Sequence, residues 1–135
     1  MLYLLDTDIS SYIMRKKPLS VLAMLEKQVQ VGNEIYISAI TYAELVLGAK
    51  CSGNPTKHLH LIAALQERLH GIQPWDAAAA EQFADLQTAL FNAGTPIGTN
   101  DTMIAAHALS LQAIMVTNNT RHFDKVPNLP LENWV

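Results

Sequence analysis

Residues 2–10 read LYLLDTDIS, and four apolar residues there lead directly into Asp6, Thr7 and Asp8. An apolar run of this length is typical of a buried strand. Two carboxylates beside a hydroxyl at the end of a strand have two interpretations. Either Asp6, Thr7 or Asp8 caps the helix that follows, or the group helps to hold a metal ion. Residues elsewhere in the chain must distinguish between these two.

Short apolar segments alternate with helical patterns along the chain. Strand patterns cover residues Leu2–Leu5, Glu34–Ser38, 113–116 and, as a short strand or turn, 71–74, and the tail from Pro127 adds a last strand or packs irregularly. Helical patterns cover residues 7–14, 18–29, 38–50, 57–70, Ala77–Asn92 and 101–111. This order predicts a mainly parallel sheet covered by helices on both faces, that is, a three-layer α/β/α sandwich.

The carboxyl ends of the predicted strands are the expected place for a site, because ligands of open parallel sheets bind there. Asp6-Thr7-Asp8 follows the first strand, and Thr117-Asn118-Asn119 follows a late one. These two polar clusters, far apart in the sequence, are therefore expected at the same edge of the sheet.

Composition favours one domain spanning residues 1–135, because 50% of the residues are hydrophobic and a chain of this length buries a continuous core. The formal net charge of −3 excludes a broad cationic field but permits a local acidic site that meets phosphate through a metal. The only basic cluster, Arg15-Lys16-Lys17, is interpreted as a solvated helix end. A single cysteine, Cys51, and the lack of a signal peptide or membrane span predict a soluble cytoplasmic protein without a membrane partner.

Glu44 stands out because its neighbours at helical spacing are mostly apolar, namely Ile40, Thr41, Leu47 and Gly48. A buried carboxylate needs a partner or a cation to offset the loss of its hydration. Glu44 is therefore either a site residue or a partly exposed residue at the edge of an apolar stripe.

Asp101 begins a nearly all-apolar helix, after a loop that contains Pro96 and Gly98. Taken alone, Asn100 or Asp101 is the cap of this helix. Alternatively, a buried helix that begins with an acid directs that acid into a cleft. Asn119 is either a turn residue or a weaker candidate for the same site.

The histidines share no metal-ligand spacing, and His107 is predicted to be a packed or hydrogen-bonded core residue. If carboxylates from separate segments converge, they repel one another and raise each other's pKa. A divalent cation keeps them ionised together, and all-oxygen ligands favour Mg²⁺ or Mn²⁺ over zinc. Such a site supports metal-assisted hydrolysis of phosphodiesters.

Five stretches match a known pattern in the right order. They are LLDTDI at 4–9, ISAITYAELVLGA at 37–49, GTPIGTNDTMIAAHAL at 94–109, IMVTNNTRHFDKVPNL at 114–129 and LENWV at 131–135. In these motifs the chain resembles PIN-domain ribonucleases, and more closely the VapC toxins of bacterial toxin–antitoxin pairs. The resemblance covers nearly the whole chain and implies a single PIN domain with the sandwich fold already expected.

The resemblance implies a metal-dependent endoribonuclease that arrests translation, with a tRNA such as initiator tRNA as a plausible substrate. Asp6 and Asp101 would be the chief ligands of Mg²⁺ or Mn²⁺, and Glu44 a further ligand or the group that positions the attacking water. The family also implies a cognate VapB-type antitoxin lying across the site, and a homodimer or a toxin–antitoxin hetero-oligomer. Helices around residues 40–70 carry apolar residues expected to exceed the needs of one core, namely Leu45, Leu59, Ile62 and Leu65.

Two positions depart from the family pattern. Asn119 stands where many PIN domains have a fourth acid, and His122 stands where another acid often precedes the phenylalanine. Three strong acids then favour one bound Mg²⁺. Asn119 is expected to orient a water or a carboxylate, and the residues expected around the ligands are Thr7, Asp8 and Thr117.

Two other classes remain open from the sequence. LLDTD also fits the start of a haloacid-dehalogenase-like phosphatase with an aspartyl-phosphate at Asp6, although the expected later lysine and acid pair are missing. A catalytically silent PIN module that only binds partners is the non-enzymatic alternative. A receiver-like signalling domain has no convincing phosphoacceptor aspartate in GIQPWD, residues 71–76.

Overall fold

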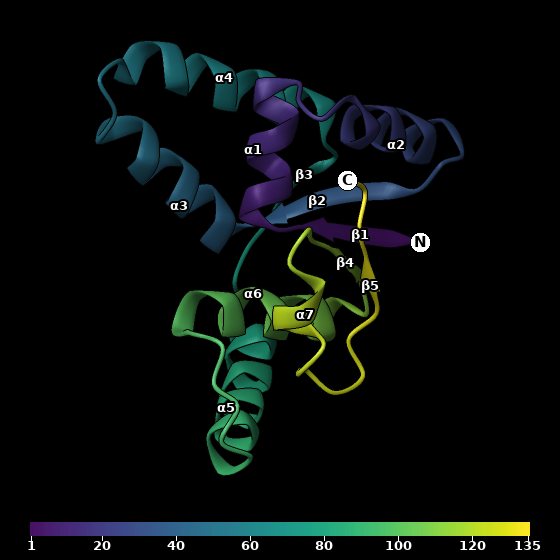
Figure 1. The fold of residues 1–135 in the computed structure, drawn as a ribbon, viewed down its shortest axis with the longest axis vertical. Helices are drawn as coiled ribbons and strands as arrows, with labels where there is room; N and C mark the ends of the chain where they lie inside the picture. Colours follow the sequence, from purple (N-terminus) through teal and green to yellow (C-terminus); the bar gives the residue numbers. More distant parts are fainter.

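A single five-stranded sheet forms the centre of the computed structural model, which describes residues 1–135 (Figure 1). Its strands are β1 (Leu2–Leu5), β2 (Glu34–Ser38), β3 (Gly71–Gln73), β4 (Ile114–Val116) and β5 (Leu131–Glu132). Their order across the sheet is β3-β2-β1-β4-β5, and every neighbouring pair is parallel. The predicted mainly parallel sheet is thus parallel throughout, and both the short strand after residue 70 and the last strand are present.

Helices cover both faces of the sheet and make the three layers that the alternating pattern predicts. They are α1 (Thr7–Arg15), α2 (Leu19–Gln30), α3 (Ala39–Lys50), α4 (Pro55–Arg68), α5 (Ala77–Asn92), α6 (Thr99–Leu111) and α7 (Thr120–Phe123). Helices α1 to α4 lie on one side of the sheet and α5 to α7 on the other (Figure 1). Each face of the sheet has its own hydrophobic core, and β1 contributes residues to both. Tyr3 and Leu5 pack against α1 to α4, and Leu4 packs on the opposite face.

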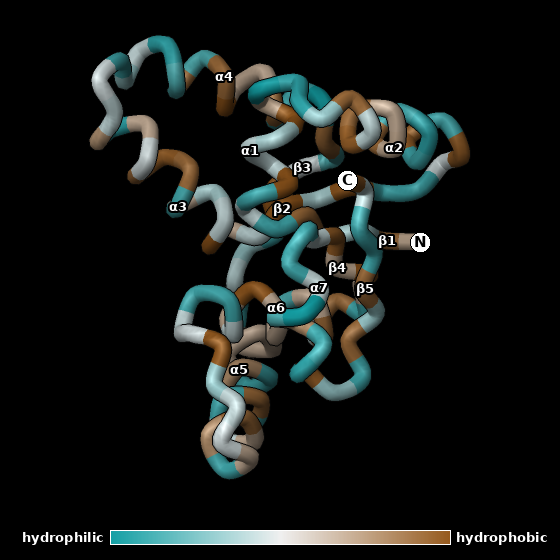
Figure 2. Tube along the Cα trace, viewed as in Figure 1, coloured by the Kyte–Doolittle hydropathy of each residue, from teal (hydrophilic) through white to brown (hydrophobic).

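Hydrophobic residues gather where these layers meet, and in Figure 2 brown stretches occur both on the strands and on the helices around them. Three of the four residues predicted to be in excess of the core, Leu45, Ile62 and Leu65, are buried within it. That expectation is wrong for them, because α3 and α4 pack over α1 and bury their own inner faces. Leu59 alone among the four is exposed. None of the helices combines the length and the apolar character needed to cross a membrane.

The register of the central strands brings the two predicted polar clusters to one edge. Leu5 pairs with Ile37 on one side and with Val116 on the other. The Asp6 N–H continues the ladder by donating to the Val116 carbonyl at 3.0 Å. Asp6 and Thr117 therefore leave the sheet side by side, as predicted from the rule for parallel sheets.

Helix α1 begins at Thr7, as predicted, and of the three candidate caps Asp6, Thr7 and Asp8 the structure has Asp6. Asp6, in extended conformation, is the N-cap, and its Oδ1 accepts a hydrogen bond from the Ile9 N–H at 2.8 Å. The capping interpretation of Asp6 is confirmed and that of Thr7 or Asp8 is wrong, because β1 ends at Leu5 and leaves no residue between strand and cap. Thr7 and Asp8 instead lie in the first turn, with their side chains beside the end of the strand.

Helix α6 begins two residues earlier than the predicted Asp101, so neither Asn100 nor Asp101 is its cap. The N-cap is Gly98, with φ of 94°, a conformation that glycine adopts without strain. Thr102 donates its hydroxyl to the Gly98 carbonyl at 2.6 Å. Asp101 lies in the first turn with no capping duty, and its carboxylate is free for other contacts.

Smaller differences concern α4 and α7. Asn54 caps α4 and Pro55 is its first residue, so the helix begins and ends two residues before the predicted range of 57–70. His70 has left the helix and pairs with the β2 residue Ile35 through both its backbone N–H and its ring Nδ1. The four-residue helix α7 has no counterpart in the prediction.

Candidate active site

A polar cavity of about 200 Å³ opens at the carboxyl edge of the sheet. The predicted site residues Asp6, Glu44, Asp101 and Asn119 all line it, although they come from the end of β1, from α3, from α6 and from the segment before α7. The full lining is Asp6, Thr7, Asp8, Glu44, Asp101, Asn119 and Phe123. The structure thus brings four carboxylates from three separate parts of the chain into one small space.

Asp6 is the buried member of the cluster, with 5% of its surface exposed. Burial raises the pKa of its carboxyl to about 6 from the ordinary 3.8. Hydrogen bonds from the Thr117 hydroxyl and the Ile9 N–H oppose this rise, whereas the charges of Asp8 and Asp101 add to it. Asp6 is therefore a carboxylate whose ionised form gains from any nearby cation.

Glu44 is half-buried, and α1 holds its carboxylate at the cavity. The Thr7 hydroxyl donates to Glu44 Oε1 at 2.9 Å and also lies 3.3 Å from the Thr41 hydroxyl. On the side of α3 where the sequence predicts an apolar stripe, Leu47 is 64% exposed. Glu44 is thus partly exposed, as one interpretation expects, and it also lines the acidic cavity.

Asp101 is held from α7 by a residue that sequence reasoning missed. His122 Nε2 lies 2.9 Å from Asp101 Oδ2, and this is the only ion-pair geometry in the structure. No sequence spacing connects positions 101 and 122, and helix α7 was not predicted. The one sequence feature that could have indicated His122 is that it stands where many PIN domains have an acid. His107, in contrast, is confirmed as a core residue whose Nδ1 is 2.8 Å from Ser38 Oγ and whose pKa is lowered by burial.

The polar segment after β4 carries Asn119 to the cavity. The Thr117 hydroxyl accepts a hydrogen bond from the Asn119 N–H at 2.9 Å, which closes a tight local turn. The side chain of Asn118 points elsewhere, toward the Tyr12 hydroxyl at 3.4 Å and Asn133 at 3.2 Å. Asn119 is therefore the asparagine of this pair that faces the acids.

The donor set fits a hard divalent cation. Every ligand candidate in the cavity is a carboxylate, hydroxyl or amide oxygen, which are the atoms that Mg²⁺ and Mn²⁺ prefer. As the side chains lie, no three His, Cys, Asp or Glu residues are close enough to hold a metal by themselves. One oxygen of Glu44 is bonded to Thr7 and one oxygen of Asp101 is bonded to His122, which leaves the other oxygen of each carboxylate for a metal. Small rotations of the carboxylates and water ligands would complete a coordination shell.

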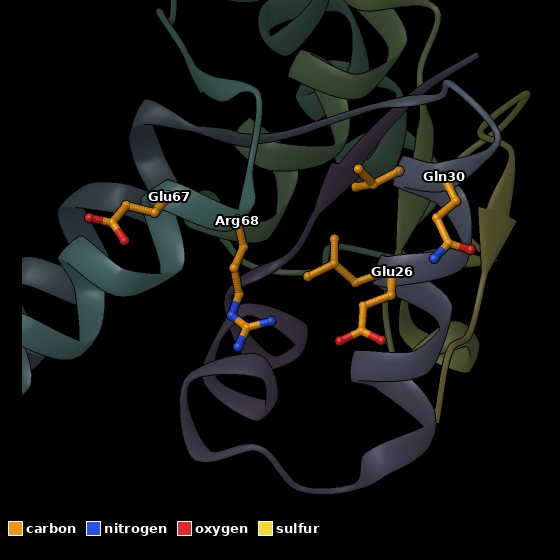
Figure 3. Close-up of a pocket in the computed structure, with 6 residues that line it drawn as sticks. Glu26, Gln30, Glu67 and Arg68 are labelled. Carbon is orange, nitrogen blue, oxygen red and sulfur yellow. The ribbon is translucent and has the colours of Figure 1, made fainter.

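A second cavity, of about 350 Å³, lies between α2 and the end of α4 (Figure 3). Arg68 and Glu26 project from the two helices toward the same space, and Glu67 points away from it. Leu25 and Val29 line the same cavity. It contains none of the predicted site residues and no cluster of acids, so the acidic cavity is the candidate active site.

The family model described as PIN domain matches residues 3–129, and the chain therefore belongs to the PIN domain family. Among its relatives is "Ribonuclease VapC1" of Haemophilus influenzae, 35% identical over 134 residues that cover 99% of this chain and 98% of the relative. Another is "tRNA(fMet)-specific endonuclease VapC" of Shigella flexneri, 36% identical over 132 residues, 98% and 97% of the two chains. Within the family the chain thus groups with the VapC proteins.

Solved structures agree with this grouping. The toxin–antitoxin complex VapBC2 from Rickettsia felis, bound to a DNA fragment from its promoter, contains a chain with a TM-score of 0.94 and 37% identity, and each chain is covered completely. DNA-bound VapBC from Salmonella typhimurium gives a TM-score of 0.92 at 32% identity, again with complete coverage. Membership of the PIN family decides against the phosphatase and receiver interpretations of the sequence. Nucleases of this family generally use a divalent metal.

Proposed function

We propose that the protein is a metal-dependent endoribonuclease of the VapC type, with Mg²⁺ as the metal and Mn²⁺ as its substitute. One observation carries the proposal: acids from distant segments, Asp6, Glu44 and Asp101, line the same small cavity in a chain whose relatives are named ribonucleases. The continuous sheet from residue 2 to residue 132 supports reading 1–135 as a single PIN domain.

Asp6 and Asp101 are the proposed chief metal ligands. Asp6 qualifies because it is buried and its ionised form is stabilised by a cation. Asp101 qualifies because the turn after Gly98 places it opposite Asp6 with one oxygen engaged by His122. When bound, a divalent ion supplies shielding of phosphate charge and activation of water. Without a cation, the negative charge of the acidic cavity would repel an RNA backbone.

Glu44 and Asn119 flank this pair and have proposed roles in positioning. Glu44 is fixed on one oxygen by Thr7, so its other oxygen is available to a ligand position or to the attacking water. Asn119 adds a neutral amide that can orient a water or a carboxylate. Around them, the Thr117 hydroxyl holds Asp6, and Asp8 adds charge at the mouth of the cavity.

An extended substrate strand has a path leading away from the acids. A neighbouring cavity shares Thr7 and Glu44 with the acidic one, and a further cavity shares Asp8 with it and reaches Arg15. These two cavities follow α1 from the acidic cavity toward its C-terminal end, where Lys16 and Lys17 are exposed. This continuity supports an RNA substrate rather than a small phosphate ester. The names of the Shigella and Salmonella relatives make a tRNA such as initiator tRNA the proposed target.

The proposed partner is a cognate VapB-type antitoxin, because the structural neighbours are VapBC complexes. A homodimer or a toxin–antitoxin hetero-oligomer is the proposed assembly. An RNA target and translational arrest place the proposed activity in the cytoplasm.

Sequencing of RNA ends after induced expression tests the proposal. The wild type is expected to produce new ends at a defined site, and Asp6→Asn is expected to produce none. Asp85→Asn, the same change at an exposed acid of α5, serves as the control and should cut like the wild type. A wild type that leaves all RNA intact, and binds no Mn²⁺ by calorimetry, would favour the catalytically silent PIN module instead.

A further inference from the structure

Helix α7 restrains His122, whose ring contacts Asp101, a residue of the acidic cavity wall. The neighbouring Phe123 is 2% exposed and packs in the core beneath α6. The His122 ring meets the Phe123 ring edge to face, with centroids 5.2 Å apart and an angle of 84° between the planes. The His122 N–H donates to the Asn119 carbonyl at 3.1 Å. Backbone and ring are thus both restrained before any contact with Asp101 is counted.

The contact itself fixes the direction of the hydrogen bond. Nε2 of His122 is 2.9 Å from Oδ2 of Asp101. An ionised carboxylate only accepts, so the proton must lie on Nε2. This bond occupies Oδ2 and leaves Oδ1 as the Asp101 oxygen that can face the cavity. Asp101 is thereby presented through one defined oxygen rather than as a freely rotating carboxylate.

Stability does not explain the pair. The side chains of His122 and Asp101 are 26% and 42% exposed, and pairs at such exposure contribute little to folding. The same arrangement recurs at the other two acids, because Ile9 N–H holds one oxygen of Asp6 and the Thr7 hydroxyl holds one oxygen of Glu44. Each proposed ligand therefore has a protein donor behind it, and for Asp101 that donor is His122.

We propose that His122 is a positioning residue that orients Asp101 for metal binding. The inference rests on the proposed function, since it concerns how this chain presents one of its proposed ligands. Donors behind metal ligands restrict their orientation, and their loss typically costs 10- to 100-fold in metal affinity. His122 acts through Asp101 and contacts neither substrate nor metal.

Calorimetric titration of the EDTA-stripped full chain with Mn²⁺ tests this. His122→Ala is expected to bind Mn²⁺ at least about tenfold more weakly than the wild type. His122→Gln, which keeps an N–H donor of similar reach, is expected to bind close to wild type. His60→Ala, at an exposed histidine on α4 away from the acidic cavity, is the control. Melting temperatures of all variants should be nearly equal, because the pair contributes little to folding.

Nitrogen-15 spectra of the imidazole rings give an independent readout in the metal-free protein. The His122 ring should show a proton on Nε2, and this signal should change in Asp101→Ala while that of His60 does not. Equal Mn²⁺ affinity in His122→Ala and wild type, equal losses in the Ala and Gln variants, or a His122 signal insensitive to Asp101→Ala would each overturn the inference. A wild type that binds no Mn²⁺ overturns the proposed function itself, and that outcome is recognised without any His122 variant.

Discussion

The hydroxyl of Thr7 donates a hydrogen bond to Glu44 Oε1 at 2.9 Å and so joins the first turn of α1 to the middle of α3. The two residues are 37 positions apart and belong to the walls of the same cavity. Residues around Glu44 on α3 are partly open to solvent, with Leu47 exposed. The Thr7 hydroxyl is the side-chain donor that holds the Glu44 carboxylate at the cavity that it shares with Asp6 and Asp101.

Thr7→Val tests the importance of this bond, because valine keeps the shape and loses the hydroxyl. A hydrogen bond to a charged group contributes about 1.5–3 kcal/mol. A loss at the lower end of this range corresponds to a roughly tenfold fall in a rate constant. We expect kcat for RNA cleavage to fall by about this factor, with a smaller change in melting temperature. Thr7→Ser, which restores the hydroxyl, should recover most of the rate. A Thr7→Val protein as active as the wild type would contradict the role proposed for Thr7.

Asp6→Asn should abolish cleavage and yet stabilise the metal-free protein at neutral pH. The folded pKa of Asp6, about 6, is above the ordinary 3.8, so ionisation favours the unfolded chain. This penalty is absent below pH 4, grows between pH 4 and 6, and is constant above. Two pKa units correspond to about 3 kcal/mol, and asparagine retains the capping oxygen for Ile9.

Urea unfolding in EDTA at pH 4 and pH 7 measures this effect. The gain in unfolding free energy of Asp6→Asn over wild type should be larger at pH 7 than at pH 4. Asp85→Asn, which removes an exposed carboxylate, should show nearly the same difference at both values. An Asp6→Asn difference that is independent of pH would show that burial does not disfavour the Asp6 charge.

Most of the fold was predictable because its signals are local. The apolar run Leu2–Leu5, the alternation of Glu34–Ser38 and the capped helix Ala77–Asn92 were all located from short-range patterns, and their order implied a parallel sheet. The cap at Gly98 was missed because the backbone conformation of the loop, and not a capping side chain, sets where α6 begins. A positive φ at Gly98 cannot be distinguished from other loop glycines by composition.

The site was predictable as a set of acids but not as a set of contacts. The strand rule and the family motifs placed Asp6, Glu44, Asp101 and Asn119 together, and they line one cavity. The donors behind those acids depend on tertiary approach between α1 and α3 and between α6 and α7. His122 was missed for this reason, since a four-residue helix leaves no periodic signal.

Asn119→Asp should strengthen metal binding. Asn119 lines the cavity with a neutral amide, and a carboxylate in its place adds a negative charge beside the existing acids. We expect tighter Mn²⁺ binding by calorimetry, because the added repulsion between acids is relieved only when the cation binds. Asn118→Asp changes the net charge equally, but its side chain points to Tyr12 and Asn133. Equal effects of the two substitutions would mean that overall charge, not the position of Asn119, controls affinity.

Neutralising the basic end of α1 should weaken RNA binding and leave the chemistry intact. Arg15 lines the cavity that continues from Asp8, and Lys16 and Lys17 follow it on the surface. At 1.5 Å per residue, the nine-residue α1 is about 13 Å long, so these cations lie beyond the cleavage site along the proposed strand path. Each phosphate contact contributes to affinity through counterion release.

In Lys16→Gln/Lys17→Gln we therefore expect a higher KM for RNA, an unchanged kcat and a shallower dependence of binding on salt concentration. Lys27→Gln, on α2, removes a charge that lines neither the acidic cavity nor its continuation. It should behave as wild type in all three measurements. If the double variant lowers kcat instead, or if Lys27→Gln raises KM as much, the strand does not run along α1 and the cluster is the solvated helix end first inferred from its sequence.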